Sequence, residues 1–298
     1  MRNERIYGVI YAVVAYTLWG ILPIYWKLID SVFSIEILSH RILWAFVFTM
    51  VIIATTREWK ALKLIMKDKK QMFYIFIASI LIAFNWGLYI WAVNSDKIVD
   101  ASLGYYINPL FAVVLGMLVF KEKLNYWQAG ALLLASVGVI IKTLQYGKIP
   151  WVSLGLAVSF GLYGMMKKFI RANSIVGLTI ETTMLVPVAA LYITARQMSG
   201  GGAFGREHIG VILLLIGSGV VTAVPLLLFS SGAKRLPLSV LGFTQYIAPT
   251  ISLFIGIFVF HEVFTAVDMI SFGLIWIALM IYSCSQMGLF KREVEVIG

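Results

Sequence analysis

Long apolar segments alternate with short polar stretches along this chain, and their lengths are the main guide to its fold. A helix of about 17 to 23 residues with few charges crosses the roughly 30 Å hydrocarbon core of a bilayer. Ten such segments lie near residues 6–26, 36–56, 72–93, 101–120, 125–143, 151–168, 176–196, 208–231, 238–260 and 266–288. The pattern predicts an all-α membrane protein with ten transmembrane helices.

One apolar stretch, with a proline near its middle and a carboxylate at its end, occurs twice. Its residues Tyr106, Ile107, Pro109, Gly116, Val119, Phe120 and Glu122 recur 140 positions later as Tyr246, Ile247, Pro249, Gly256, Val259, Phe260 and Glu262. A duplication of this kind predicts two copies of one membrane unit, residues 1–148 and 149–298. With five spans each, the second unit enters the membrane from the opposite side. We therefore expect two inverted five-helix repeats in one integral membrane bundle.

Composition and charge agree with a membrane protein and predict its orientation. Of the 298 residues, 61% are hydrophobic and 13% are charged, whereas soluble domains carry about 25% charged residues. The net charge of +10 does not indicate a nucleic-acid partner, because the basic residues lie in short loops at span ends. About seventeen of the 24 Lys and Arg residues fall on one side of the predicted topology. The positive-inside rule then predicts a multi-pass protein of the cell membrane with both termini in the cytoplasm.

The two repeated prolines, Pro109 and Pro249, are the first candidates for a functional role. Proline lacks a backbone N–H, so the carbonyls of Tyr105 and Gln245 lose their helical partners inside the membrane. Such kinks are useful in a substrate cavity, and they also occur as simple packing kinks. Their equivalent places in two repeats favour the cavity.

Polar and aromatic side chains gather around these prolines. Amides and phenols can hydrogen-bond a polar solute, while Trp and Tyr rings cover its apolar part. The expected substrate pathway consists of Trp19, Asn85, Trp86, Tyr89, Tyr105, Tyr106, Asn108, Thr222, Gln245 and Tyr246. The alternative is that these groups only hydrogen-bond one helix to another.

Charged side chains inside the spans are few, and each is costly in lipid. His40 and Arg41 lie about one turn into the second span, and Glu181 lies about one turn into the seventh. Arg41 can hold a substrate carboxylate, and His40 or Glu181 can carry a coupling proton. Snorkelling of these side chains to the membrane surface is the alternative. The repeated Glu122 and Glu262 end their helices, where we expect structural roles.

Signals for enzymatic chemistry are missing from the sequence. There is no P-loop and no G-x-S-x-G nucleophile motif. The three histidines are scattered, and Cys284 is the single cysteine, so we expect no metal site, cofactor or disulfide. The chain is therefore not expected to be an enzyme.

Several polar-aromatic strings occur in order and are spread over the whole chain. They are residues 15–27 (AYTLWGILPIYWK), 36–44 (EILSHRILW), 85–94 (NWGLYIWAVN), 101–109 (ASLGYYINP), 221–229 (VTAVPLLLF) and 245–250 (QYIAPT). These strings resemble the RarD branch of the EamA transporters in the drug/metabolite transporter superfamily. The resemblance implies two inverted five-helix repeats and a secondary carrier that moves small metabolites or drugs, commonly outward. One departure is that Lys121 and His261 stand where such proteins often have glycine before the glutamate.

Three functions are compatible with these observations. The first is a secondary transporter, an exporter or permease, in which the two repeats alternate access to a central cavity. The second is a non-transporting helical membrane protein, scramblase-like or an assembly component, whose polar residues only join helices. The third is a membrane-embedded enzyme. The expected partners are a small-molecule substrate and the lipid bilayer, and the sequence is compatible with a homodimer.

Overall fold

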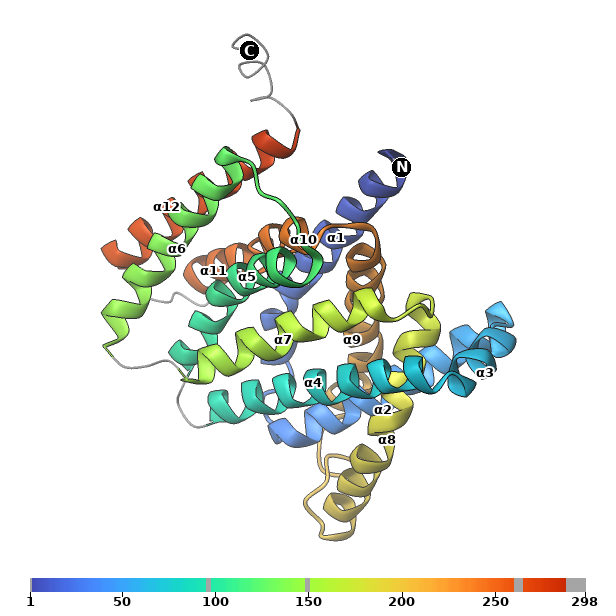
Figure 1. Cartoon of the computed structure of the whole chain (residues 1–298). Helices are drawn as coiled ribbons and strands as arrows, with labels where there is room; N and C mark the ends of the chain where they lie inside the picture. Colours follow the sequence, from blue (N-terminus) through green and yellow to red (C-terminus); the bar gives the residue numbers. More distant parts are fainter. Residues whose placement is uncertain (1, 95–97, 148–150, 260–264, 288–298) are drawn as a thin grey trace, which may run out of the picture.

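The computed structural model describes residues 2–94, 98–147, 151–259 and 265–287, and its regular structure there is helical throughout. Twelve helices follow one another along these residues (Figure 1). They are α1 (Arg2–Lys27), α2 (Ser34–Thr56), α3 (Trp59–Lys67), α4 (Lys69–Asn94), α5 (Ile98–Phe120), α6 (Tyr126–Tyr146), α7 (Trp151–Phe169), α8 (Ser174–Met198), α9 (Ile209–Arg235), α10 (Leu238–Gln245), α11 (Ile247–Phe258) and α12 (Ala266–Gln286).

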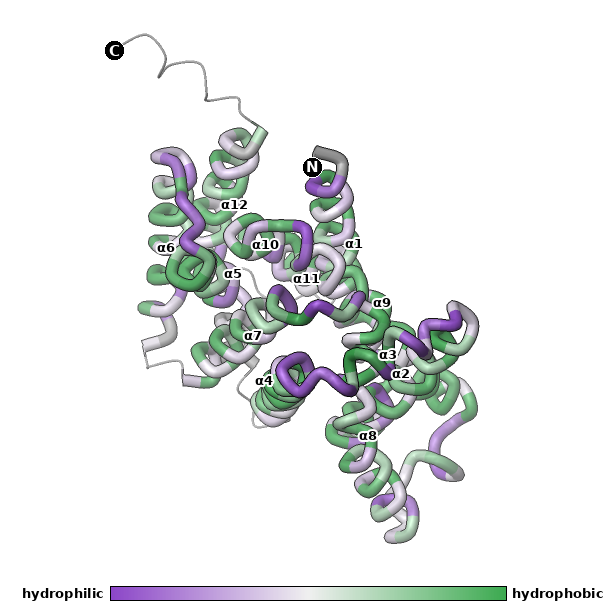
Figure 2. Tube along the Cα trace, turned by 45° about the vertical axis from the view of Figure 1, so that its right-hand side comes forward, coloured by the Kyte–Doolittle hydropathy of each residue, from purple (hydrophilic) through white to green (hydrophobic). Residues whose placement is uncertain are grey.

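Within the described residues, eight helical segments are long and apolar enough to cross a membrane, with α10 and α11 together forming one of them. A shorter apolar segment, Gly104–Phe120, lies in α5. Figure 2 shows hydrophobic residues along the helices and hydrophilic residues gathered at turns and helix ends, for example at the start of α4. The prediction of an all-α membrane protein is confirmed. Ten crossings and the inversion of the repeat remain predictions.

Helix α3 was not predicted, because its residues resemble a basic loop. Leu62 is buried and Ile65 packs against the core, whereas Lys60 and Lys63 are exposed. Apolar residues at a spacing of three define one face of a helix, so this short segment is amphipathic. At nine residues it is too short to cross a bilayer.

The two repeated prolines have different effects on their helices. Helix α5 continues through Pro109. The corresponding segment is interrupted at Tyr246, which separates α10 from α11. Because Pro249 has no N–H for the carbonyl of Gln245, helical bonding resumes only with the Thr250 N–H, which donates to the carbonyl of Tyr246.

Matching capping boxes begin α6 and α12. In each, the N-cap side chain accepts from the N–H three residues later, and that residue's side chain accepts from the N-cap N–H. The pairs are Asn125 with Gln128 and Thr265 with Asp268. Asn125 also bonds Ser285, which ties the start of α6 to the end of α12. The α6–α12 pair lies side by side along one edge of the molecule (Figure 1).

The turn after α5 shows why glycine would suit the position of Lys121, where this chain differs from the family pattern. This residue has φ 53°, in the left-handed region that favours glycine. The turn directs Glu122 toward the start of α10. The N-cap residue of that helix, Pro237, makes no side-chain hydrogen bond to the free backbone N–H groups there. The Glu122 carboxylate accepts from the N–H groups of Leu238 (2.6 Å) and Ser239 (2.9 Å) instead. Its expected structural role is thus confirmed, whereas Glu262 and His261 lie outside the described residues.

Candidate functional site

A buried ion pair joins α7 and α8 where the two helices meet. Lys167 and Glu181 form this pair, and each side chain is 1% exposed. The hydroxyl of Tyr163 donates to the second carboxylate oxygen of Glu181 at 3.1 Å. A buried carboxylate needs both a counter-charge and hydrogen bonds, and Glu181 has both.

Further polar contacts close the same end of the bundle. Lys168 lies 3.6 Å from Glu122 and donates to the carbonyl of Leu236 at 2.7 Å. Lys234 donates to the carbonyl of Ala172, at the α7–α8 turn. These contacts join the ends of α5, α7 and α9 and the start of α10. We call this region the closed end.

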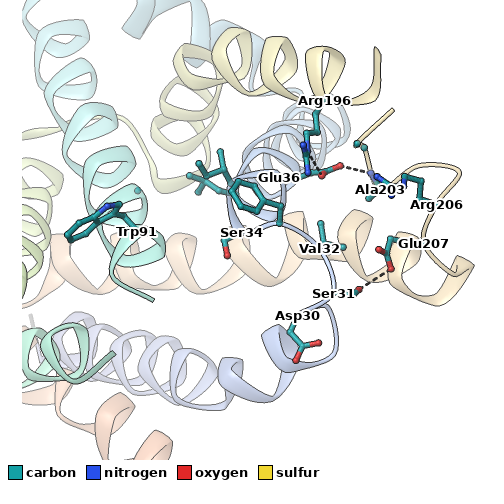
Figure 3. Close-up of a pocket in the computed structure, with 16 residues that line it drawn as sticks. Asp30, Ser31, Val32, Ser34, Glu36, Trp91, Arg196, Ala203, Arg206 and Glu207 are labelled. Atoms are coloured by element: carbon teal, nitrogen blue, oxygen red, sulfur yellow. Dashed lines mark hydrogen bonds and ion pairs between the residues drawn. The ribbon is translucent and has the colours of Figure 1, made fainter. Parts of the chain in front are cut away.

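The opposite end of the bundle contains a cavity of about 1010 Å³ (Figure 3). It lies between the start of α2, the second half of α4, and the α8–α9 loop. Its lining consists of Asp30, Ser31, Val32, Phe33, Ser34, Ile35, Glu36, Leu38, Gly87, Trp91, Arg196, Gly201, Gly202, Ala203, Arg206 and Glu207. A Cβ added at Gly87 would meet nothing within 4 Å, so α4 borders open space there. We call this region the open end.

Glu36 fastens the α8–α9 loop to α2. Its carboxylate accepts from the Ala203 N–H at 2.6 Å and lies 3.7 Å from the Arg196 guanidinium (Figure 3). Ser31 adds a second link, because its hydroxyl donates to Glu207 at 2.9 Å. Glu36 is the first residue of the predicted span 36–56, and its role was missed because its partners are more than 150 residues away.

Arg41 lies between α1, α4 and α9. Its guanidinium carbon is 4.5 Å from the ring centroid of Trp26 and 4.9 Å from that of Trp86. Its Nε donates to the Thr222 hydroxyl at 3.0 Å. Three predicted residues, Arg41, Trp86 and Thr222, therefore meet. Trp26 was missed, since only its place in a family string marked it.

His40 does not join this cluster. Its side chain is fully buried and packs edge-on to Phe204, with ring centroids 5.2 Å apart. Neither ring nitrogen has a hydrogen-bond partner in the described part of the chain. Its proposed part in proton coupling stays a prediction.

The two proline-containing segments meet each other. The hydroxyl of Tyr246 donates to the carbonyl of Tyr106 at 3.2 Å, although these equivalent residues are 140 positions apart. Gly242 packs beside them, since a Cβ there would lie 2.7 Å from the Pro109 carbonyl oxygen. The repeated stretch is thus a contact between the two halves.

The other predicted pathway residues make contacts between helices or carry buried amides. Trp19 packs against Phe160 and Phe229 at centroid distances of 5.7 and 5.6 Å. Asn85 donates to the Leu156 carbonyl and the Ser159 hydroxyl, both at 2.9 Å, which joins α4 to α7. The remaining residues are the ring pair Tyr89 and Tyr105, 5.9 Å apart, and the buried Asn108 and Gln245.

Comparisons with known proteins add the family. The profile of the EamA-like transporter family matches residues 6–144. The uncharacterized transporter YojE of Bacillus subtilis is 49% identical over 283 residues, which cover 94% of each chain. Protein RarD of Escherichia coli is 42% identical over 275 residues, which cover 92% of this chain and 93% of that protein. This chain belongs to the RarD branch of the EamA transporter family.

The fold of this EamA transporter also matches a solved crystal structure, with a TM-score of 0.73 at 16% identity. The match covers 97% of this chain and 100% of that one. Such a likeness shows the fold alone. The apolar helices and the bacterial relatives identify this EamA member as a multi-pass membrane transporter.

Proposed function

We propose that this transporter is a secondary carrier that moves small metabolites or drugs out of the cell by alternating access. In this proposal the chain crosses the membrane ten times, α10 and α11 together make the ninth crossing, and the halves 1–148 and 149–298 are inverted repeats. Both termini face the cytoplasm of a bacterial cell.

The difference between the two ends of the bundle supports this mechanism most directly. The closed end has the buried Lys167–Glu181 pair and the Glu122 contacts, whereas the open end has a cavity of about 1010 Å³. A carrier that alternates access is open on one side and closed on the other in each resting state. The structure corresponds to an outward-open state if the termini are cytoplasmic.

Between the ends, the proposed pathway contains the Arg41 cluster, the Tyr89–Tyr105 ring pair and the proline-containing segments. The break at Tyr246 provides a hinge, because a short interruption lets α10 and α11 change their relative angle. The contact between Tyr246 and Tyr106 connects that hinge to the other half.

Solute flux in reconstituted vesicles tests the function. Purified protein in proteoliposomes without ATP should exchange labelled solutes from a panel of carboxylic acids, amino acids, nucleosides and antibiotics. Empty vesicles serve as the control. Vesicles that scramble labelled lipids but move no solute would favour the non-transporting alternative, and a chemically altered solute would favour an enzyme.

Cysteine labelling tests the orientation. After Cys284→Ser removes the single native cysteine, Gly201→Cys in the α8–α9 loop should react with an impermeant maleimide in intact cells. A cysteine at Lys63 in α3 should react only after the cells are opened. The reverse pattern would refute the proposed topology.

Proton coupling by Glu181, with His40 as second choice, is part of the proposal and needs a modified test. Because Glu181 pairs with Lys167, changing it alone leaves a buried lysine without its partner. The double variant Lys167→Met/Glu181→Gln removes both charges. If Glu181 carries the proton, this variant should exchange solute but lose accumulation driven by a pH gradient. Accumulation at the parent level would exclude Glu181.

A further inference from the structure

Arg41 differs from four other cations in the helices, at positions 142, 167, 168 and 196, because each of those has a carboxylate within 4 Å. Among the described residues no carboxylate lies within that distance of Arg41. A cation in a membrane interior without a counter-charge is costly, which makes it a candidate for ligand binding.

The guanidinium has fixed contacts, but these use only one of its N–H donors. Trp26 and Trp86 lie against it, and its Nε–H donates to Thr222. A guanidinium has five N–H donors, so the four on its two terminal nitrogens remain. The Arg41 side chain is only half-buried, so it is not sealed from the space around it.

The open cavity is lined by residues close in sequence to this cluster. Its lining includes Leu38, one turn before Arg41 on α2, and Gly87, next to Trp86 on α4. The open space beside Gly87 allows a solute to approach along α4. Tyr89, one turn further on α4, adds a ring that pairs with Tyr105.

Resting on the proposed transport function, we propose that Arg41 binds the carboxylate of the transported solute, a small organic monoanion with an aromatic or apolar body. Two parallel N–H groups on the terminal nitrogens match the two oxygens of a carboxylate. The indole and phenol rings of Trp26, Trp86, Tyr89 and Tyr105 cover the body.

Charge balance selects a monoanion. One guanidinium neutralises one negative charge, so a phosphate dianion would keep an unpaired charge inside the bundle. An amino acid would bring an ammonium group, and Glu36, the carboxylate of the cavity lining on the same helix as Arg41, already pairs with Arg196 and the Ala203 N–H.

The test compares acids with their neutral amides. Thermal shifts and competition in flux assays are measured with benzoate, phenylacetate and 3-phenylpropionate, with the three matching amides, and with inorganic phosphate. At least one acid should stabilise the parent and inhibit its flux, and the amides and phosphate should not. Arg41→Gln should weaken acid binding about 10- to 100-fold, the loss expected for a charged hydrogen-bonded pair. The affinity of Arg41→Lys for the acid should lie between that of the parent and that of Arg41→Gln.

Control variants distinguish binding at Arg41 from nonspecific attraction of the acid to other cations of the cavity. Arg206→Gln removes a cation from the cavity lining and should leave acid binding unchanged. Gly87→Leu fills the proposed approach and should weaken binding while leaving Arg41 intact. Equal shifts by an acid and its amide, an unchanged Arg41→Gln variant, or no shift by any acid would each overturn the proposal.

Further outcomes distinguish a lipid site from a solute site, and failure of the anion inference from failure of the transport function. The measurements are repeated in micelles with and without phosphatidylglycerol, and an Arg41-dependent shift caused by this lipid alone would assign the site to a lipid headgroup and overturn the solute proposal. If the parent exchanges neutral solutes and Arg41→Gln does so equally, the anion inference fails while the transport function stands. If the parent moves no solute at all, the transport function itself fails.

Discussion

Arg41 and Glu181 occupy corresponding places in the two halves, 140 positions apart on the second helix of each half, but their surroundings differ. Glu181 is paired with Lys167 and Tyr163 from α7, the first helix of its half. Arg41 receives the ring of Trp26 from α1, the first helix of the other half, and no counter-charge from the described residues. A charged residue stands at both positions, and the neighbouring helix determines whether the protein neutralises it.

The comparison explains the difference between the ends of the bundle. A charge that the protein neutralises joins helices together, and at the closed end α7 and α8 are joined in this way. A charge without a protein partner requires open space or a ligand, and the cavity of the open end is lined by Leu38, one turn before Arg41, and by Gly87, next to Trp86. Breaking the Glu181 pair should therefore change mainly the stability of the protein, and changing Arg41 should affect mainly transport.

The largest expected effect comes from breaking the buried pair. Lys167→Met should lower the free energy of unfolding by about 3–5 kcal/mol, because it leaves the Glu181 carboxylate buried without its counter-charge. The double variant Lys167→Met/Glu181→Gln should recover most of this loss. Chemical unfolding in detergent, followed by tryptophan fluorescence, measures both. A single variant as stable as the parent would show that the pair does not hold the closed end.

A second expectation concerns the two prolines, which also occupy corresponding positions. Alanine provides the missing N–H, so Pro249→Ala should join α10 to α11 and reduce solute flux several-fold. Pro109→Ala should have a smaller effect, since α5 already continues through that residue. Flux per folded protein in vesicles is the measurement. Parent flux in both variants would remove the hinge from the mechanism.

Arg41→Met should change the free energy of unfolding by less than about 1 kcal/mol. The variant loses two ring contacts with the cation, each contributing about 0.5–1 kcal/mol, and the hydrogen bond to Thr222, but no carboxylate is left unpaired and a buried charge disappears. The same unfolding assay applies. A loss as large as that of Lys167→Met would mean that Arg41 has a structural partner and that the two positions do not differ.

The smallest effect is expected where the two halves meet. Tyr246→Phe removes one hydrogen bond to the Tyr106 carbonyl, and side-chain hydrogen bonds inside membranes contribute about 0.6 kcal/mol on average. Tyr106→Phe, which leaves that carbonyl in place, is the matched control. If Tyr246→Phe unfolded the protein, this contact would be a main support of the interface between the halves.

Features that depend on neighbours in sequence were predictable. Apolar length located the helices, and the capping boxes at Asn125 and Thr265 are equally local, because their partners are three residues away. Proline chemistry indicated a disturbance near Pro249, but it did not distinguish a break at Tyr246 from the continuous helix at Pro109. Helix α3 was missed because charged residues outnumber its buried ones, and nine residues give a weak periodic signal.

The sequence by itself determined the class of the protein, its repeat and the charged positions that cost most in lipid, because these follow from local hydrophobicity and from internal similarity. Only the tertiary structure decided what each charge does. The partners of Glu36 come from the α8–α9 loop and those of Arg41 from three other helices. The cost of a buried charge is set by the groups around it, and those groups are brought together by helix packing rather than by spacing along the chain.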